Sequence, residues 1–338
     1  MTSDGVVTEP DPAGMGTLRR RTLRLGCAVD ARALDDDAYS STVARLFDVV
    51  TPENALKFGP LRPDRETYDF GTADRVMEFA ESHGLAVRGH TLAWHSQLAD
   101  WVAETPEAER EGILRDHIRT VVGRYRGRIE QWDVVNEALD DDARPRRSPW
   151  FEAMGIDYIA DAFRWAHETD PSARLYLNDY NVEDLGPKSD AYYELVQRLL
   201  ADGVPVHGFG VQGHRIVGDP PSTMRENLQR FADLGLEVAL TEVDVRMPVA
   251  ESGHPSGEQL AAQADDYRSM FDAARAVPEC TAFVLWGLSD AHSWIPDTFA
   301  GFGAAHVLDE SLQPKPAFDA VFSEPVGAAA FANGPEPR

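Results

Sequence analysis

The sequence predicts a single α/β domain, a (β/α)8 barrel in which eight parallel strands alternate with eight helices. Three observations indicate this fold class. Apolar runs of strand length alternate with segments of helical periodicity along the whole chain. No Gly/Ser-rich linker divides the chain. Finally, 338 residues with 43% hydrophobic content are enough to build one large core.

Strands that are buried on both faces read as nearly continuous apolar runs, because helices cover both sides of a parallel sheet. Eight segments have this pattern. The predicted strands span residues 23–29, 49–54, 86–92, 131–137, 174–179, 208–212, 237–243 and 282–288.

Apolar residues at helical spacing lie between these strands. Thr72 is expected to cap one helix, which ends before Gly84. The predicted helices span residues 37–47, 72–83, 106–125, 156–168, 188–201, 221–234, 259–276 and 316–322. We assign residues 21–324 to the barrel, and residues 1–20 and 325–338 to flexible ends.

The charge balance excludes several classes of partner. Lys and Arg number 32 and Asp and Glu number 57, which gives a formal net charge of −25. Nucleic acids and anionic membranes select clustered basic residues, so we expect neither as a partner. No apolar stretch is long enough to span a bilayer. We expect a monomer.

Compartment signals are weak. The basic run at residues 19–21 is followed by an apolar stretch that is short for a secretory signal and is interrupted by Arg24, which predicts a cytoplasmic protein. The alternative is an extracellular protein whose signal lies upstream or was removed. Cys27 and Cys280 are expected to be reduced, packed thiols. A disulfide bridge stays conceivable if their strands are neighbours.

Polar and aromatic side chains gather where the predicted strands end, which is where (β/α)8 barrels carry their active sites. Packing alone does not explain so many costly polar groups. The candidates, in chain order, are Glu53, Asn54, Lys57, His90, Trp94, Asn136, Glu137, Tyr180, Asn181, Gln212, His214, Glu242, Asp244, Trp286 and Trp294.

Two of these side chains, Glu137 and Glu242, end predicted strands on roughly opposite sides of the barrel. Paired carboxyl groups surrounded by indoles and amides suit the cleavage of a glycosidic bond. The separation of the two carboxyl groups distinguishes retaining from inverting glycosidases, and the sequence leaves both mechanisms open.

Six ordered motifs between about residues 24 and 322 resemble those of glycoside hydrolase family 10, the endo-β-1,4-xylanases. They read ENALKF, RGHTLAWHSQ, WDVVNEA, VQGH, TEVD and SWIPDTFAGFGAAHVLDESLQPKPAF. The resemblance implies endo-hydrolysis of β-1,4 bonds in xylan or xylo-oligosaccharides with retention of configuration. Glu137 would be the acid/base and Glu242 the nucleophile. No metal ion or cofactor is expected.

The resemblance also implies supporting roles. Asn136 would bind the substrate 2-hydroxyl, and His214 would hold Glu242 with Asp244 as its own partner. Trp286 and Trp294 would form an aromatic floor and cap. The glycone side would be lined by Glu53, Asn54, Lys57, His90, Trp94 and Gln212, and the aglycone side by Tyr180 and Asn181.

Two departures from the family pattern stand near these motifs. Phe58 replaces a usual Trp, which could loosen Lys57, and Gly213 replaces a common Ser. His95 is expected to be a packed structural histidine, and Asp133 to lie behind the site. Three alternatives stay open: another retaining glycosidase such as a β-glucanase, a metal-dependent hydrolase, and a non-catalytic sugar-binding barrel.

Overall fold

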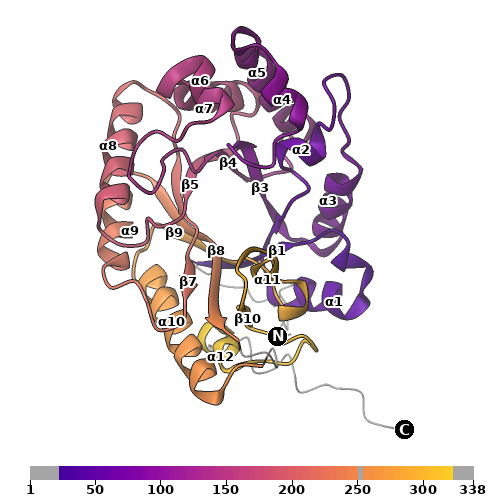
Figure 1. Ribbon diagram of the computed structural model, residues 1–338, viewed down its shortest axis with the longest axis vertical. Coiled ribbons are helices and arrows are strands. Elements are labelled where there is room, and N and C mark those ends of the chain that lie inside the picture. Colours follow the sequence, from indigo (N-terminus) through magenta and orange to yellow (C-terminus); the bar gives the residue numbers. More distant parts are fainter. Residues whose placement is uncertain (1–22, 250–253, 323–338) are drawn as a thin grey trace, which may run out of the picture.

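The computed structural model describes residues 23–249 and 254–322, so the predicted ends at 1–20 and 325–338 lie outside the described residues. Parallel strands close into a barrel, and helices surround it (Figure 1). The barrel strands are β1 (Arg24–Val29), β2 (Val49–Pro52), β3 (Ala86–Ala93), β4 (Gln131–Asn136), β5 (Arg174–Asp179), β6 (Gly208–Val211), β8 (Glu237–Pro248) and β9 (Cys280–Leu285). Strand β9 pairs with both β1 and β8, which closes the ring and confirms the predicted fold class.

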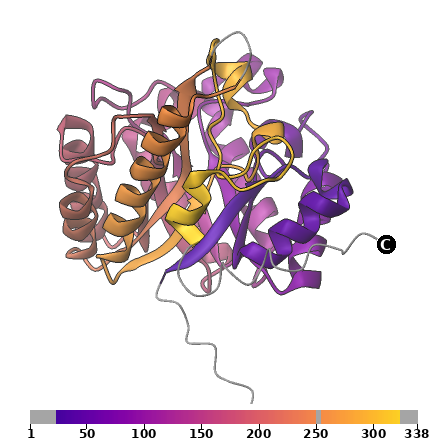
Figure 2. The same ribbon diagram turned by 90° about the horizontal axis from the view of Figure 1, so that it is seen from below.

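One large helix follows or precedes each strand, as predicted. These helices are α1 (Asp37–Leu46), α3 (Gly71–His83), α5 (Glu107–Arg124), α7 (Tyr158–Thr169), α8 (Pro187–Ala201), α9 (Met224–Ala232), α10 (Gly257–Arg275) and α12 (Pro316–Phe322). Figure 2 shows α10 (orange) and α12 (yellow) side by side on the outside of the strands. The expected cap of α3 is wrong, because Thr72 lies inside the helix and Phe70 precedes it without a side-chain cap.

Apolar side chains fill the layer between strands and helices, while the inside of the barrel is partly polar. Arg88 on β3 forms a buried ion pair with Asp133 on β4, and its guanidinium lies over the Tyr176 ring. A Cβ at Gly210 would lie 2.3 Å from the Asn178 amide oxygen. Glycine at this position of β6 therefore leaves room for Asn178 inside the barrel.

Strand β8 is longer than predicted, and two short strands pair with its extension. They are β7 (His214–Ile216) and β10 (Phe302–Gly303). Short helices that the sequence analysis did not identify lie in the loops: α2 (Phe58–Leu61), α4 (Asp100–Glu104), α6 (Pro149–Met154) and α11 (Ile295–Thr298). Segments this short carry no measurable periodicity, so the sequence pattern does not reveal them.

The two cysteines are free and buried. Their strands, β1 and β9, are neighbours, which was the condition for a bridge. However, Cys27 pairs with Leu285, at the opposite end of β9 from Cys280. At about 3.3 Å per residue, the two thiols lie roughly 16 Å apart along the strands, far beyond the reach of a disulfide.

Candidate active site

A cleft of about 900 Å³ opens at the carboxyl ends of the barrel strands. All of the predicted site residues except Asp244 line it, although they come from seven different strand ends. Asp244 is fully buried and lies behind His214. Concave sites with few, well-placed polar groups are typical of ligand binding. The fold thus brings together residues that are up to 241 positions apart, from Glu53 to Trp294.

Glu242 on β8 has surroundings that favour its ionised form. The amide Nδ2 of Asn178 donates to its Oε1 at 2.7 Å, and His214 Nε2 lies 3.4 Å from Oε2. His90 Nδ1 lies 3.8 Å from Oε1. Burial acts to raise the pKa of Glu242, but the charge of His90 and the contact with His214 outweigh it and lower the pKa. Glu242 therefore carries a negative charge in a nearly dry position.

A short relay of contacts, from Trp294 through Asp244 to His214, holds the His214 imidazole against Glu242. The indole N–H of Trp294 donates to Asp244 Oδ2 at 2.8 Å, and the same oxygen lies 3.0 Å from His214 Nδ1. Burial acts to lower the pKa of His214, but the charges of Asp244 and Glu242 raise it to about 10. His214 is consequently a cation at neutral pH and presents its second nitrogen to Glu242.

Glu137 follows β4 in a left-handed backbone conformation, with φ of 56°. Its main-chain N–H donates to the Asn178 carbonyl at 2.8 Å, and Gln212 Nε2 donates to its Oε1 at 3.3 Å. Its side chain is 12% exposed, compared with 5% for Glu242. The two carboxyl groups thus differ in their partners, which is how similar acids acquire different roles.

His95 has a different environment from the one expected. The sequence analysis treated it as a packed structural histidine, but its Nδ1 lies 3.6 Å from Glu137 Oε2. Burial lowers the pKa of His95, against the opposing charge of Glu137. No sequence signal separates this orientation from a packed one, because the side chain follows the strand end by two residues.

Lys57 connects the residues of the expected glycone side. Its ammonium donates to Asn54 Oδ1 at 2.8 Å and lies 5.0 Å from the Trp94 ring centroid and 5.9 Å from that of Trp286. Burial lowers the pKa of Lys57, although nearby glutamates act in the opposite direction. Burial likewise raises the pKa of Glu53. The substitution at Phe58 leaves these contacts in place.

Asp133 supports His90 from outside the cleft. His90 Nδ1 lies 3.0 Å from Asp133 Oδ2, and Arg88 Nε donates to the same oxygen at 3.1 Å. Asp133 does not line the cleft. Asn136 lies nearby, and its amide oxygen accepts from Asn178 Nδ2 at 2.9 Å and from Gln212 Nε2 at 3.2 Å. His90 and Asn136 are therefore fixed by partners that a single strand pattern does not reveal.

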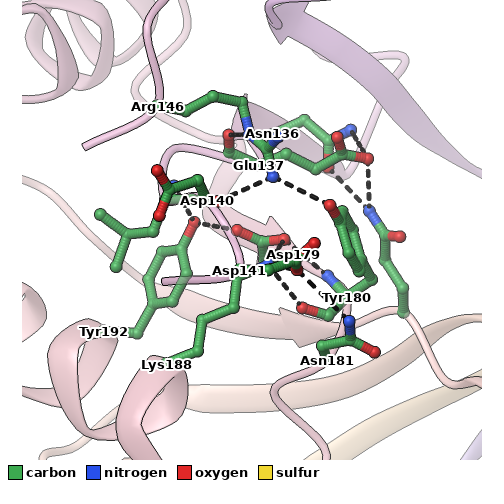
Figure 3. Close-up of polar contacts among 12 residues, drawn as sticks. Asn136, Glu137, Asp140, Asp141, Arg146, Asp179, Tyr180, Asn181, Lys188 and Tyr192 are labelled. Atoms are coloured by element: carbon green, nitrogen blue, oxygen red, sulfur yellow. Dashed lines mark hydrogen bonds and ion pairs between the residues drawn. The ribbon is translucent and has the colours of Figure 1, made fainter. Parts of the chain in front are cut away.

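Tyr180 and Asn181 follow β5 and also line the cleft, and Figure 3 shows both near Glu137. The Tyr180 hydroxyl accepts from Arg146 Nη2 at 3.0 Å, and Asn181 Nδ2 donates to Asp141 Oδ1 at 3.3 Å. Both side chains thus contact the loop that follows Glu137. This loop brings together the two strand ends that line this side of the cleft.

Several lining residues were missed by the sequence analysis. They are Asp30, Arg32, Gln97, Arg246, Ala291, His292, Ser293, Asp297, Thr298 and Phe299. Most lie in the loops after β1 and β9, whose paths no local pattern defines. Arg246 carried a usable signal, since it lies two residues after Asp244 on the same strand, where alternate side chains share a face.

The substitution at Gly213 has a structural reason. Its φ is 82°, a conformation that a serine rarely adopts, and a Cβ there would lie 3.1 Å from Val243 Cγ2. Its N–H donates to the buried Glu183 carboxylate at 3.0 Å. Glycine therefore lets the chain turn tightly between Gln212 and His214.

Within residues 23–249 and 254–322, no group of three or more His, Cys, Asp or Glu side chains is arranged to hold a metal ion. His90 and His95 contact Asp133 and Glu137 respectively. Each imidazole therefore has a carboxylate partner of its own instead of sharing one centre.

Comparisons with known proteins agree with this arrangement. Residues 16–324 match the model of glycosyl hydrolase family 10. An endo-1,4-beta-xylanase of Agaricus bisporus is 40% identical over 302 residues, covering 88% of this chain and 89% of that protein. Native xylanase 10B from Thermotoga maritima has a TM-score of 0.85 at 39% identity, covering 89% of this chain and 94% of that chain.

Xylanase 10B from Thermotoga petrophila RKU-1, solved in complex with xylobiose, has the same TM-score of 0.85 at 38% identity. It covers 89% of this chain and 93% of that chain. The family match, the closed barrel and the cleft at its strand ends all lead to one assignment. This chain belongs to glycosyl hydrolase family 10.

Proposed function

We propose that the protein hydrolyses internal β-1,4-xylosidic bonds of xylan and xylo-oligosaccharides with retention of configuration. One observation carries this proposal: two glutamates, Glu137 and Glu242, line the same cleft, and the surroundings of Glu242 lower its pKa. Family membership and the relative solved with xylobiose support the choice of a xylose polymer.

In the proposed reaction, ionised Glu242 attacks the anomeric carbon while Glu137 donates a proton to the departing sugar oxygen. A covalent glycosyl-enzyme results. Glu137 then removes a proton from water, which attacks the anomeric carbon and releases Glu242. The cationic His214 and the amide of Asn178 hold the Glu242 carboxylate in one orientation. Glu137 thus carries out both proton transfers, and Glu242 forms the covalent bond to the sugar.

The aromatic lining supports a pentose in this cleft. Trp286 and Trp294 present apolar surfaces that suit the C–H faces of a pyranose ring. Trp294 is fixed by its bond to Asp244 and packs against His214, with ring centroids 5.0 Å apart. We propose that this rigid cap crowds the position of a 5-hydroxymethyl group, which glucose has and xylose lacks.

Initial rates on xylan and on carboxymethyl-cellulose test the substrate assignment. We expect faster hydrolysis of xylan, because the cap disfavours glucose units. Faster hydrolysis of the cellulose derivative would instead support the β-glucanase alternative. Assays with excess chelator test the metal-dependent alternative, and we expect no loss of activity.

No helix among the described residues is long and apolar enough to cross a membrane. A cytoplasmic location stays a prediction of the sequence. Xylanase activity measured in the washed cells and in the culture medium tests it, and activity found mainly in the medium would contradict it.

A further inference from the structure

A set of polar contacts connects Glu137 to Tyr180, on the expected aglycone side of the cleft (Figure 3). After β4 the chain folds back on itself, with Leu139 and Pro145 paired in an antiparallel bridge. The Arg146 N–H donates to the Ala138 carbonyl at 2.8 Å. This hairpin brings the Arg146 side chain back to Glu137, where the loop begins.

The Arg146 guanidinium binds three acceptors at once. Its Nε donates to the Glu137 carbonyl at 2.9 Å, and its Nη2 donates to the Leu139 carbonyl at 2.9 Å and to the Tyr180 hydroxyl at 3.0 Å. A left-handed backbone is unfavourable for a residue with a side chain, so Glu137 needs external support. Arg146 holds its carbonyl, and Asn178 holds its N–H.

Tyr180 is in turn contacted by Lys188 of α8. The Lys188 ammonium lies 3.8 Å from the Tyr180 ring centroid and donates to the Tyr180 carbonyl at 2.9 Å. It also donates to Asp179 Oδ1 at 2.9 Å, and the Tyr192 hydroxyl donates to the other Asp179 oxygen. Lys188, Asp179 and Tyr192 are all buried. Turning the Tyr180 ring would therefore break its contacts with Lys188 and Arg146.

We propose that Arg146 is a positioning residue, which makes proton transfer by Glu137 depend on Tyr180, the side chain expected to contact the leaving sugar. A sugar pressed against Tyr180 would tighten the Arg146 contact that fixes the Glu137 backbone. Lys188 and Asp179 supply the rigid base for this coupling. The inference rests on the proposed function, since it concerns the acid/base step of that reaction.

The test compares two substrates that differ in their need for a proton. Xylopentaose has a poor leaving group and fills the aglycone side, whereas 2,4-dinitrophenyl β-xylobioside releases an anion that needs no protonation. For Arg146→Met we expect kcat/KM on xylopentaose to fall at least about tenfold, a modest part of what acid catalysis supplies. On the aryl glycoside, kcat/KM should stay within about twofold, because it reports the first step only.

Arg144→Met is the matched control. Arg144 lies on the same hairpin, is exposed, and has one ion pair, with Asp142 at 3.6 Å. Neither substrate should be affected by this change. Tyr180→Phe gives a second variant, which keeps the ring over Lys188 and removes only the hydroxyl that Arg146 binds. It should show the same selective loss, at smaller size.

Equal losses on both substrates would mean that Arg146 supports only the fold, and would overturn the inference, as would the absence of any loss. The parent protein separates this outcome from failure of the proposed function. If it does not cleave xylopentaose, the proposed function is refuted and this inference with it. If it cleaves xylopentaose and Arg146→Met loses both activities equally, only this inference fails.

Discussion

At the scale of single residues, Glu137 and Glu242 carry the same functional group in two different environments. Glu242 is more deeply buried and has a cation and an amide as partners, which lower its pKa. Glu137 is more exposed and accepts from Gln212. A nucleophile must be ionised, and the surroundings of Glu242 favour that form, as the proposed reaction requires.

Replacing Glu242 by Ala should remove turnover and leave binding. Without a nucleophile no glycosyl-enzyme forms, and we expect kcat on xylohexaose to fall by roughly 10⁴-fold or more. Titration calorimetry with xylohexaose should still detect binding, because the remaining lining residues are intact. Turnover at the parent rate would refute the nucleophile assignment. Turnover lost together with a collapsed fold would show in the circular dichroism spectrum.

Asp244→Asn tests the relay behind Glu242. Because the Asp244 charge raises the pKa of His214 against burial, its removal should lower that pKa, which is about 10 in the parent protein. Nitrogen-edited NMR of the His214 ring measures this shift directly. As pH rises through the new pKa, His214 becomes neutral, and kcat/KM should then fall about tenfold. An unchanged His214 titration would contradict the relay.

The sequence revealed the types of residue at the strand ends, and the structure brings all of them except Asp244 to one cleft. It did not reveal His95 beside Glu137 or the bond from Arg146 to the Tyr180 hydroxyl. The reason is physical. A strand end fixes where a side chain begins, whereas the loop that follows decides which way it points, and loop geometry depends on contacts between distant segments.

At the scale of elements, the long strands and helices were predictable because their apolar runs and helical spacing reflect burial in one layer. The extension of β8 was not, because its partners β7 and β10 are only a few residues long. The ranges predicted for β2 and β4 extend too far at their carboxyl ends, for a related reason. Glu53 and Glu137 come directly after the last residues of these strands, so they already belong to the loops of the cleft.

Helix α8 supplies a stability prediction through Lys188. Burial raises the pKa of Asp179 to about 7 against the opposing charge of Lys188, and the charge of Glu137 adds to the rise. Above pH 7, Asp179 is an anion paired with Lys188, so Lys188→Met should lower the free energy of unfolding by about 3–5 kcal/mol at pH 8. At pH 5 Asp179 is already protonated, and the cost should be smaller.

Urea unfolding at pH 5 and pH 8 measures this difference. The matched control is Arg198→Met, which removes an exposed cation from the same helix and should change stability by less than about 0.5 kcal/mol at either pH. An equal cost for Lys188→Met at both pH values would show that its contribution comes from packing of the side chain and not from its charge.

At the scale of the whole molecule, the net charge of −25 describes the surface more than the site. Within the cleft, the cations Lys57 and His214 lie among the carboxylates. The proposed substrate is neutral along its main chain, so we expect the overall charge to aid solubility and to keep copies of the chain apart. We therefore predict a monomer near 37.3 kDa by sedimentation velocity. A species of twice that mass at micromolar concentration would contradict this.

The pH dependence of stability also follows from the site. The folded pKa of His214 is raised from 6.5 to about 10, so its stabilising contribution is complete below about pH 6.5 and is lost as pH rises through 10. We expect Tm to fall between pH 8 and pH 10.5. The fall should be smaller in His214→Gln, which has no proton to lose. Identical falls in both proteins would assign the loss to general charge repulsion.

The central claim is that Glu137 and Glu242 cleave internal β-1,4-xylosidic bonds with retention, and proton NMR of xylohexaose hydrolysis tests it most directly. The anomeric signals report the position of cleavage and the configuration of the first product in one experiment. We predict xylobiose, xylotriose and xylotetraose as early products, with the new reducing end appearing first as the β-anomer. Early appearance of the α-anomer, or release of single xylose units only, would contradict the account.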